Sequence, residues 1–168
     1  PTISADATTV IEDAAALLTT GGTITVVDVD ANESFVTPQT NVAGLYGTFS
    51  INENGVWTYS ADNTQTVIQS LGATETLTET FTVTSLDGTA TSNVVVTIQG
   101  TNDLPELSVV DAILIENTSP ITFTFDASDI DGTITTIGES LYGAVSINGN
   151  QVTYTPSATH PEKSYLTI

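Results

Sequence analysis

The feature that most constrains the fold is a hairpin pattern that occurs twice. Apolar and polar residues alternate over residues 45–51 and 56–60, on either side of a turn at 52–55 that contains an Asn-Gly pair. This pattern is typical of two antiparallel strands joined by a tight turn. The run Leu-Tyr-Gly-Thr-Phe-Ser-Ile-Asn, which begins at Leu45, returns as Leu-Tyr-Gly-Ala-Val-Ser-Ile-Asn from Leu141. A period of about 100 residues predicts tandem domains, because solenoid repeats are shorter.

The rest of the first copy also predicts β-structure. Runs rich in β-branched residues alternate with turn-forming residues. We expect strands at 7–13, 23–27, 76–84 and 92–99, at most a helical turn at 14–18, a polar loop or edge region at 34–44 and one or two helical turns within 64–71. About seven short strands in about 100 residues predict a β-sandwich. The residues expected in its core are Phe49, Trp57, Tyr59 and Phe81.

A short connector at residues 100–106 separates the two copies. Pro105 fixes its own φ and disfavours helix at the residue before it, so we expect the connector to be extended and stiff. One sandwich is therefore predicted over residues 1–103 and a second over residues 104–168. The second copy stops before the counterpart of the strand at 92–99, so we expect it to be incomplete at its C-terminus.

The chain is strongly acidic. It contains 20 Asp and Glu residues against 1 Lys or Arg, which gives a formal charge of −19. This balance excludes nucleic acid and anionic membrane surfaces as main partners, because almost no basic side chain is available to displace counterions. Two carboxylates about 4 Å apart repel by about 4 kcal/mol near a protein surface. Clustered acids in such a chain therefore favour binding of a divalent cation.

Composition also bounds how the chain is stabilised. Hydrophobic residues make up 39% of it and the mean hydropathy is +0.15, so it can bury a core. It has no cysteine, so stability must come from the core rather than from disulfides, with bound metal as an optional further source. No apolar run approaches the about 18 residues that a membrane-spanning helix needs.

Several motifs resemble the VCBS repeat, and they follow one another in the order of that family. They are DVDANES at 28–34, YGTFSI at 46–51, GVWTY at 55–59, QSLG at 69–72, ETLTETF at 75–81, DG at 87–88 and GTND at 100–103. The second copy is similar to a more diverged cadherin-like sandwich. The resemblance implies an all-β chain of tandem immunoglobulin-like or cadherin-like β-sandwiches, the second truncated.

The same resemblance implies a function and a location. Such modules belong to large bacterial RTX-type surface adhesins, which a type I system exports and which serve in cell adhesion and biofilms. Their tandem sandwiches bind calcium and act as an extender, so the implied location is extracellular. The implied partners are neighbouring repeats of the same chain, while other domains bind any host or biofilm ligand.

Strand direction predicts half of a calcium site at the N-terminal end of the first sandwich. The first strand leaves that end and the second returns to it, which places Asp28 and Asp30 there together with Asp87. Aspartates at i and i+2 point the same way as they leave a strand, so one loop can present two carboxylates to an ion. We expect weak or no binding unless a preceding domain supplies the remaining ligands.

A fuller calcium site is predicted between the two domains. The first strand ends there, the connector crosses it, and the second copy repeats its Asp-x-Asp pattern at its near end. The residues expected to converge are Glu12, Asn102, Asp103, Asp129 and Asp131, with Glu75 as a further candidate. Side-chain oxygens of this number can satisfy the six to eight positions of Ca²⁺. The alternative for every acidic pair is a solvated loop.

Other functions are less well supported by the sequence. We expect no enzyme, because the single histidine, His160, has no cysteine or serine partner and, like Lys163, is expected to be an ordinary surface residue. The alternative to an extender is a ligand-binding module for a glycan, a protein or ice. The outward threonines of the strand at 76–84 are explained more simply as β-formers on a solvated face. Alternation places Trp57 in the core rather than on a sugar platform.

Overall fold

The chain divides into two compact units, Pro1–Asn102 (unit 1) and Asp103–Ile168 (unit 2). The computed structural model describes residues 1–30, 32–108, 119–134, 139–140, 143–149, 151–156 and 166–167. Their secondary structure is almost entirely β-strand, with one short helix, α1, at Thr66–Gln69. The all-β prediction is therefore confirmed. Within these residues no helix is long and apolar enough to cross a membrane.

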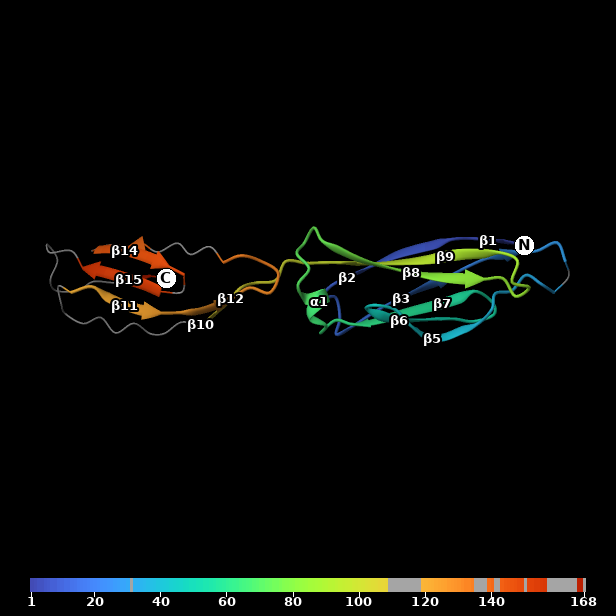
Figure 1. Cartoon of the computed structure of the whole chain (residues 1–168), viewed down its shortest axis with the longest axis horizontal. Coiled ribbons are helices and arrows are strands. Elements are labelled where there is room, and N and C mark those ends of the chain that lie inside the picture. Colours follow the sequence, from blue (N-terminus) through green and yellow to red (C-terminus); the bar gives the residue numbers. More distant parts are fainter. Residues whose placement is uncertain are drawn as a thin grey trace. The chain divides into compact units, whose positions relative to one another are not determined.

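Unit 1 is a sandwich of two sheets (Figure 1). The first sheet has the order β2-β9-β8, formed by Asp6–Ile11, Thr91–Gln99 and Thr76–Thr84. The second has the order β3-β7-β6-β5, formed by Leu17–Thr23, Val56–Asp62, Gly47–Ile51 and Gln39–Ala43. A small ribbon pairs β1 (Thr2–Ile3) with β4 (Val26–Val27). Strand β2 runs parallel to β9, and all other pairs are antiparallel.

Alternation along the strands decides which side chains the two sheets bury. In β8 the threonines face solvent, while Phe81 and Val83 point into the sandwich. Phe81 stacks on Phe49 of β6 in the other sheet, with ring centroids 4.6 Å apart and planes at 8°. The four residues predicted for the core, Phe49, Trp57, Tyr59 and Phe81, are all buried. Aromatic stacking across the layers thus joins the two sheets.

The predicted hairpin is confirmed as β6 and β7, which pair from Gly47 opposite Ala61 to Ile51 opposite Trp57. Its turn is held by the side chain of Asn52, whose oxygen accepts hydrogen bonds from the amides of Asn54 (3.0 Å) and Val56 (3.1 Å).

The prediction of a helical turn at 14–18 followed by a break at the glycine pair is wrong. Leu17 and Leu18 begin β3, and Gly21 and Gly22 continue it. A Cβ on Gly22 would collide with Oδ2 of Asp6 and lie 2.9 Å from Nε1 of Trp57, which donates to that oxygen, so this glycine makes room for the buried ring and its acceptor. The predicted strand at 23–27 is also divided, because β3 ends at Thr23 and β4 covers only Val26–Val27.

Unit 2 is also built of short antiparallel strands. The pairs are β14 (Gly143–Asn148) with β15 (Gln151–Pro156), β11 (Ile121–Thr124) with β15, β10 (Glu106–Ser108) with β12 (Asp126–Ser128), and β13 (Glu139–Ser140) with β16 (Leu166–Thr167). The predictions for His160 and Lys163 lie outside the described residues.

The hairpins of the two units share a packing detail. In β6–β7, a Cβ on Gly47 would lie 2.5 Å from the ring of Tyr59 on the neighbouring strand. In β14–β15, a Cβ on Gly143 would lie 2.5 Å from the ring of Tyr154. Both tyrosine side chains are buried at 2% exposure. The repeat in the sequence thus has a physical basis, since each tyrosine ring covers a glycine across the hairpin.

Candidate metal centre

Three carboxylates from separate parts of unit 1 lie together. Asp28 follows β4, Glu33 lies in the loop between β4 and β5, and Asp87 lies in the turn between β8 and β9. One carboxylate oxygen from each lies within 4.8 Å of the other two. We call these residues the acidic cluster.

The loop that carries Glu33 is attached to the turn that carries Asp87. Val36 forms an isolated antiparallel bridge with Ser85, and both residues are fully buried. The amide of Leu86 donates to the carbonyl of Phe35 at 3.0 Å. These backbone contacts place Glu33, two residues before Phe35, beside Asp87.

Asp87 is held in its charged form by its own turn. The hydroxyls of Ser85 and Thr89 donate to its two oxygens, and the amide of Thr89 donates to Oδ1 at 3.1 Å. These hydrogen bonds lower the pKa of Asp87 to about 2, and the bond from Ser85 has the largest effect. The cluster therefore contains a fixed negative charge throughout the neutral pH range.

Asp28 brings a buried oxygen into the cluster. Its side chain is 3% exposed, and Oδ1 accepts a hydrogen bond from the amide of Asp30 at 3.0 Å. Its other oxygen, Oδ2, is buried and accepts no hydrogen bond. The ammonium nitrogen of Pro1 lies 3.7 Å from Oδ2, which is an ion-pair distance. One positive charge does not balance three carboxylates.

The acidic cluster has the chemistry of a hard-cation site. Glu33 is half-buried and Asp87 is exposed, and carboxylates this close still repel one another at the effective dielectric of a protein surface. Ca²⁺ takes six to eight oxygen ligands, and each carboxylate can supply one or two. Asp28, Glu33 and Asp87 therefore fit Ca²⁺, with further positions left for other oxygens.

The cluster overlaps with the predicted N-terminal site but is not identical to it. Asp28 and Asp87 were both predicted, whereas Asp30 is exposed and is not one of the three grouped residues. Glu33 was not predicted as a ligand. It is the third acidic residue of the 28–34 segment, and that spacing was the available signal.

The remaining predicted ligands of unit 1 lie where β2 and β9 end. Glu12 is buried at 1% exposure, and its Oε2 accepts a hydrogen bond from the amide of Thr101 at 3.0 Å. Its Oε1 accepts from Nε2 of Gln69 at 3.3 Å. Glu75 is exposed and accepts from the amide of Gly72 at 3.0 Å, while Asn102 is exposed. The structure thus gives Glu12 protein hydrogen-bond donors.

Unit 2 brings its own predicted ligands near one another. The amide of Asp103 donates to Oδ2 of Asp131 at 3.2 Å. Oδ1 of Asp131 and Oδ1 of Asp129 are buried and accept no hydrogen bond. A Cβ on Gly132 would lie 2.6 Å from Oδ2 of Asp129, so this glycine leaves room for the carboxylate. A site that joins these residues to Glu12 and Asn102 stays a prediction.

One buried carboxylate, Glu79, has a different role. It points inward from β8 and is 5% exposed. It accepts hydrogen bonds from the amides of Leu45 (3.0 Å) and Tyr46 (2.8 Å) and from the hydroxyl of Tyr59 (2.8 Å). Burial and this bond raise the pKa of the Tyr59 hydroxyl far above its usual range, so it remains a donor. Glu79 therefore holds the β5–β6 turn against β8.

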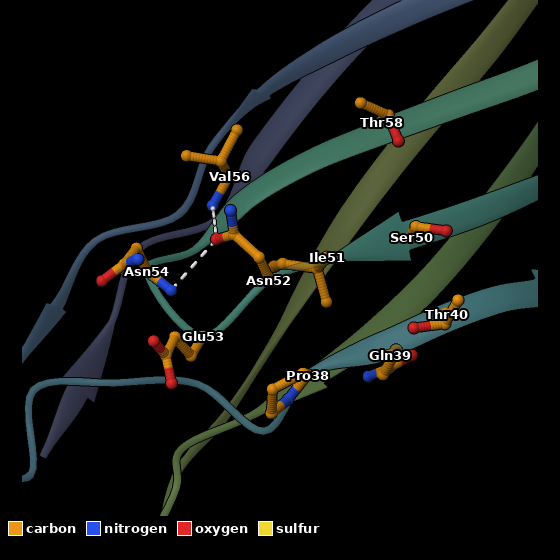
Figure 2. Close-up of a pocket in the computed structure, with 10 residues that line it drawn as sticks. All are labelled: Pro38, Gln39, Thr40, Ser50, Ile51, Asn52, Glu53, Asn54, Val56 and Thr58. Atoms are coloured by element: carbon orange, nitrogen blue, oxygen red, sulfur yellow. Dashed lines mark hydrogen bonds between the residues drawn. The ribbon is translucent and has the colours of Figure 1, made fainter.

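A groove crosses the outer face of the second sheet (Figure 2). Thr40, Ser50 and Thr58 line it from neighbouring strands, and the hairpin turn with Glu53 forms one end. None of its ten lining residues is aromatic. The groove therefore lacks the ring platform on which sugars commonly stack.

Comparison with known families identifies the first unit. No curated protein matches the chain. The sequence model described as "Bacterial cadherin-like domain" matches residues 1–100, which are most of unit 1 and more than half of the chain. The all-β sandwich of unit 1 agrees with the cadherin-like part of the sequence prediction. The chain therefore belongs to the bacterial cadherin-like domain family.

Proposed function

We propose that this chain is a calcium-stabilised structural module, an extender segment of an extracellular bacterial adhesin. One observation carries the proposal. Within the acidic cluster, Oδ2 of Asp28 is buried and accepts no hydrogen bond, while Glu33 and Asp87 add two more carboxylates within 4.8 Å. A divalent cation would supply the counter-charge and the missing partner together.

Family membership supports the adhesin part of the proposal. A cadherin-like sandwich suits a repeated module of a surface protein, and a chain without cysteine needs another source of stability outside the cell. Export by a type I system and a role in biofilms rest on the resemblance to VCBS repeats. Calcium outside cells is millimolar, which suits modules that bind it at about 10⁻⁴ to 10⁻³ M.

The cluster has as many carboxylates as the two-loop prediction, with Glu33 in the place of Asp30. That prediction counted Asp28, Asp30 and Asp87 and expected weak binding without a preceding domain. In the structure Glu33 lies beside Asp28 and Asp87, and Oδ2 of Asp28 is buried without a hydrogen bond. We therefore expect calcium to bind to this chain on its own.

A calcium titration followed by NMR tests the proposal residue by residue. Amide signals of residues 28–34 and 86–89 should shift in the millimolar range, and they should not shift in the double variant Asp28→Asn, Asp87→Asn. Glu53→Gln is the matched control, because Glu53 is an exposed acid in the β6–β7 turn, outside the cluster. Equal shifts in the double variant and the control would contradict calcium binding at this site.

The extender role has its own test. We propose that calcium also restricts the connector between the units, through the predicted ligands Glu12, Asn102, Asp103, Asp129 and Asp131. Small-angle scattering should then show a narrower range of inter-unit distances in millimolar calcium than in chelator. Protease should cut the connector more slowly with calcium. No change in either measurement would contradict the extender role while leaving calcium binding at the acidic cluster intact.

A further inference from the structure

Two of the four edge strands of the unit 1 sandwich, β5 and β8, differ in how well they are protected against pairing with another chain. Strand β5, at the edge of the second sheet, is interrupted by a register shift between Gln39 and Val42, and Asn41 there has a positive φ of 50°. Pro38 precedes it directly. Bulges and prolines of this kind prevent a sheet edge from pairing with another chain. The β5 edge is thus closed to strand addition.

Strand β8, at the edge of the first sheet, has none of these features. Its nine residues pair with β9 in continuous register from Thr76 to Thr84, without proline, glycine or bulge. Its outward side chains are uncharged, although the chain as a whole carries a formal charge of −19. Among the described residues no strand pairs with its other edge, and a groove between β5 and residues 78–82 lies beside it.

The hydrogen bonds show which β8 residues present their backbone to this free edge. The carbonyl of Thr82 accepts from Nε2 of Gln39 at 2.9 Å, and the carbonyl of Thr84 accepts from the amide of Thr37 at 2.9 Å. Both partners lie on the side away from β9. Since alternate residues of an antiparallel edge strand face outward, Thr76, Thr78 and Thr80 also direct their amides and carbonyls there. These three have no such partner in the described part of the chain.

The outward sequence of this edge is the same in both directions. Every even-numbered position from Thr76 to Thr84 is threonine. A second copy of β8 can therefore lie antiparallel to the first with threonine opposite threonine at every backbone-bonded pair. Threonine pairs of this kind are favourable cross-strand neighbours. Strand self-complementarity makes a second copy the occupant that fits best.

One register pairs only the three residues, Thr76, Thr78 and Thr80, whose outward backbone groups have no partner in the described part of the chain. With Thr78 opposite Thr78 of the second copy, Thr76 pairs with Thr80, and the bonds of Thr82 and Thr84 to residues 37–39 stay intact. A shift by one step would place Glu79 opposite Glu79 and would oppose Thr82 with Thr76. We propose that unit 1 forms a two-fold dimer by antiparallel pairing of the β8 edges in the Thr78-centred register, which joins two three-stranded sheets into one.

This dimer is closed and does not depend on the calcium proposal. Both copies use the same surface, so the contact is isologous and leaves no further β8 edge for a third copy. Charge opposes it, because two strongly acidic chains repel over distances that salt screens. The association should therefore strengthen as NaCl rises.

Sedimentation velocity from micromolar to millimolar protein tests the association. The wild-type chain should show a monomer–dimer equilibrium at physiological salt. Thr78→Lys should raise the dimer dissociation constant about tenfold or more, because two ammonium groups would face each other at the two-fold axis. The matched control is Thr58→Lys, at an exposed threonine in the middle of the second sheet. A monomeric wild type at millimolar concentration, or equal effects of both variants, would overturn the proposal.

A cross-linking experiment tests the register and does not depend on a variant that weakens association. The chain has no cysteine, so Thr78→Cys and Thr58→Cys each introduce a single thiol. Backbone-bonded antiparallel pairs have Cα atoms about 5.5 Å apart, a spacing that a disulfide spans. Under mild oxidation Thr78→Cys should form covalent dimers at least about tenfold faster than Thr58→Cys. Equal rates would exclude the Thr78-centred pairing.

Discussion

Unit 1 contains two carboxylates with buried oxygens, Glu79 and Asp28, and their surroundings differ. Glu79 is buried in the sandwich, and three protein donors, the amides of Leu45 and Tyr46 and the hydroxyl of Tyr59, surround it. In the acidic cluster, Asp28 also has a buried oxygen, yet that oxygen accepts no hydrogen bond and two other carboxylates lie within 4.8 Å. Glu79 thus has three protein donors, whereas Asp28 has one amide donor and an ion pair with Pro1.

This comparison indicates which of the two sites depends on dissolved ions for its stability. Glu79 joins the β5–β6 turn to β8 whatever ions are present, because its partners are backbone and side-chain donors. In the acidic cluster one buried oxygen of Asp28 accepts no hydrogen bond and lies beside two other carboxylates, so the stability of the cluster should depend on a dissolved cation. Unit 1 thus has one carboxylate anchor, Glu79, that the protein itself completes, and a second anchor, the acidic cluster, that a bound cation would complete.

The largest effect should come from removing the built-in anchor. Glu79→Ala leaves the hydroxyl of Tyr59 and two amides without their acceptor, and we expect a loss of about 3 kcal/mol in the free energy of unfolding. For a domain of this size that lowers Tm by about 10 °C or more. Thermal unfolding followed by circular dichroism measures it, and the loss should be equal with calcium and with chelator.

Glu53→Gln is the matched control for this comparison, because it removes an exposed carboxylate from the β6–β7 turn. Its effect on Tm should be small. A Glu79→Ala variant that unfolds no earlier than this control would show that the turn at 44–46 is held by other contacts. If the drop in Tm caused by Glu79→Ala disappeared in chelator, Glu79 would depend on calcium as the acidic cluster is expected to, and the distinction between the two sites would be wrong.

The second-largest effect should come from removing calcium. At ten times the dissociation constant, one bound ion adds about 1.4 kcal/mol to the stability of unit 1. Chelator should therefore lower Tm of the wild-type chain by several degrees, and calcium should restore it. Magnesium at the same concentration should restore less, because it demands a smaller, octahedral shell. A Tm that is identical in calcium and chelator would contradict the ion-dependent anchor.

Much of this fold could be predicted from the sequence, because local patterns dominate it. The alternation in Thr76–Thr84 matches β8 residue for residue, and the Asn-Gly turn gives the β6–β7 hairpin. The same alternation shows that Glu79 faces inward, since it lies between the buried-face positions Leu77 and Phe81. The secondary structure was predicted wrongly at residues 14–27, where β3 continues through the glycine pair because Gly22 makes room for the Trp57 ring.

The candidate site was predicted less completely, because it depends on contacts between distant loops. Asp28 and Asp87 could be placed at one end from strand direction alone. Glu33 lies beside Asp87 because Val36 and Ser85 pair as a β-bridge, and no local sequence pattern indicates this pairing. Asp30 lies only two residues from Asp28, yet it is exposed, and its amide instead bonds to the Asp28 carboxylate. Spacing thus predicted the loop but not which of its acids face the cluster.

A smaller effect with a change of sign should follow from Asp28→Asn. In calcium the variant should be less stable than wild type, because a ligand carboxylate is lost. In chelator it should be more stable by about 1 kcal/mol or less, because one of three mutually repelling charges is gone. Thermal unfolding of both proteins in both conditions measures the crossover. A variant that is less stable in both conditions would mean that Asp28 acts through hydrogen bonds alone.

The smallest effect should be the pH dependence that Asp87 contributes without calcium. Hydrogen bonds from Ser85 and Thr89 lower its pKa to about 2 in the folded chain, below the unfolded value of 3.8. A lowered pKa stabilises the fold above the unfolded value, and this contribution is lost as pH falls from about 4 to about 2. In chelator, Asp87→Asn should flatten the dependence of stability on pH in that window, whereas Glu53→Gln should not. The hydroxyls of Ser85 and Thr89 already keep the Asp87 carboxylate charged at neutral pH. Calcium should therefore compete with protons for this carboxylate only between about pH 4 and about pH 2. An NMR titration in which the Asp87 carboxyl signal titrates near pH 4 would contradict this expectation.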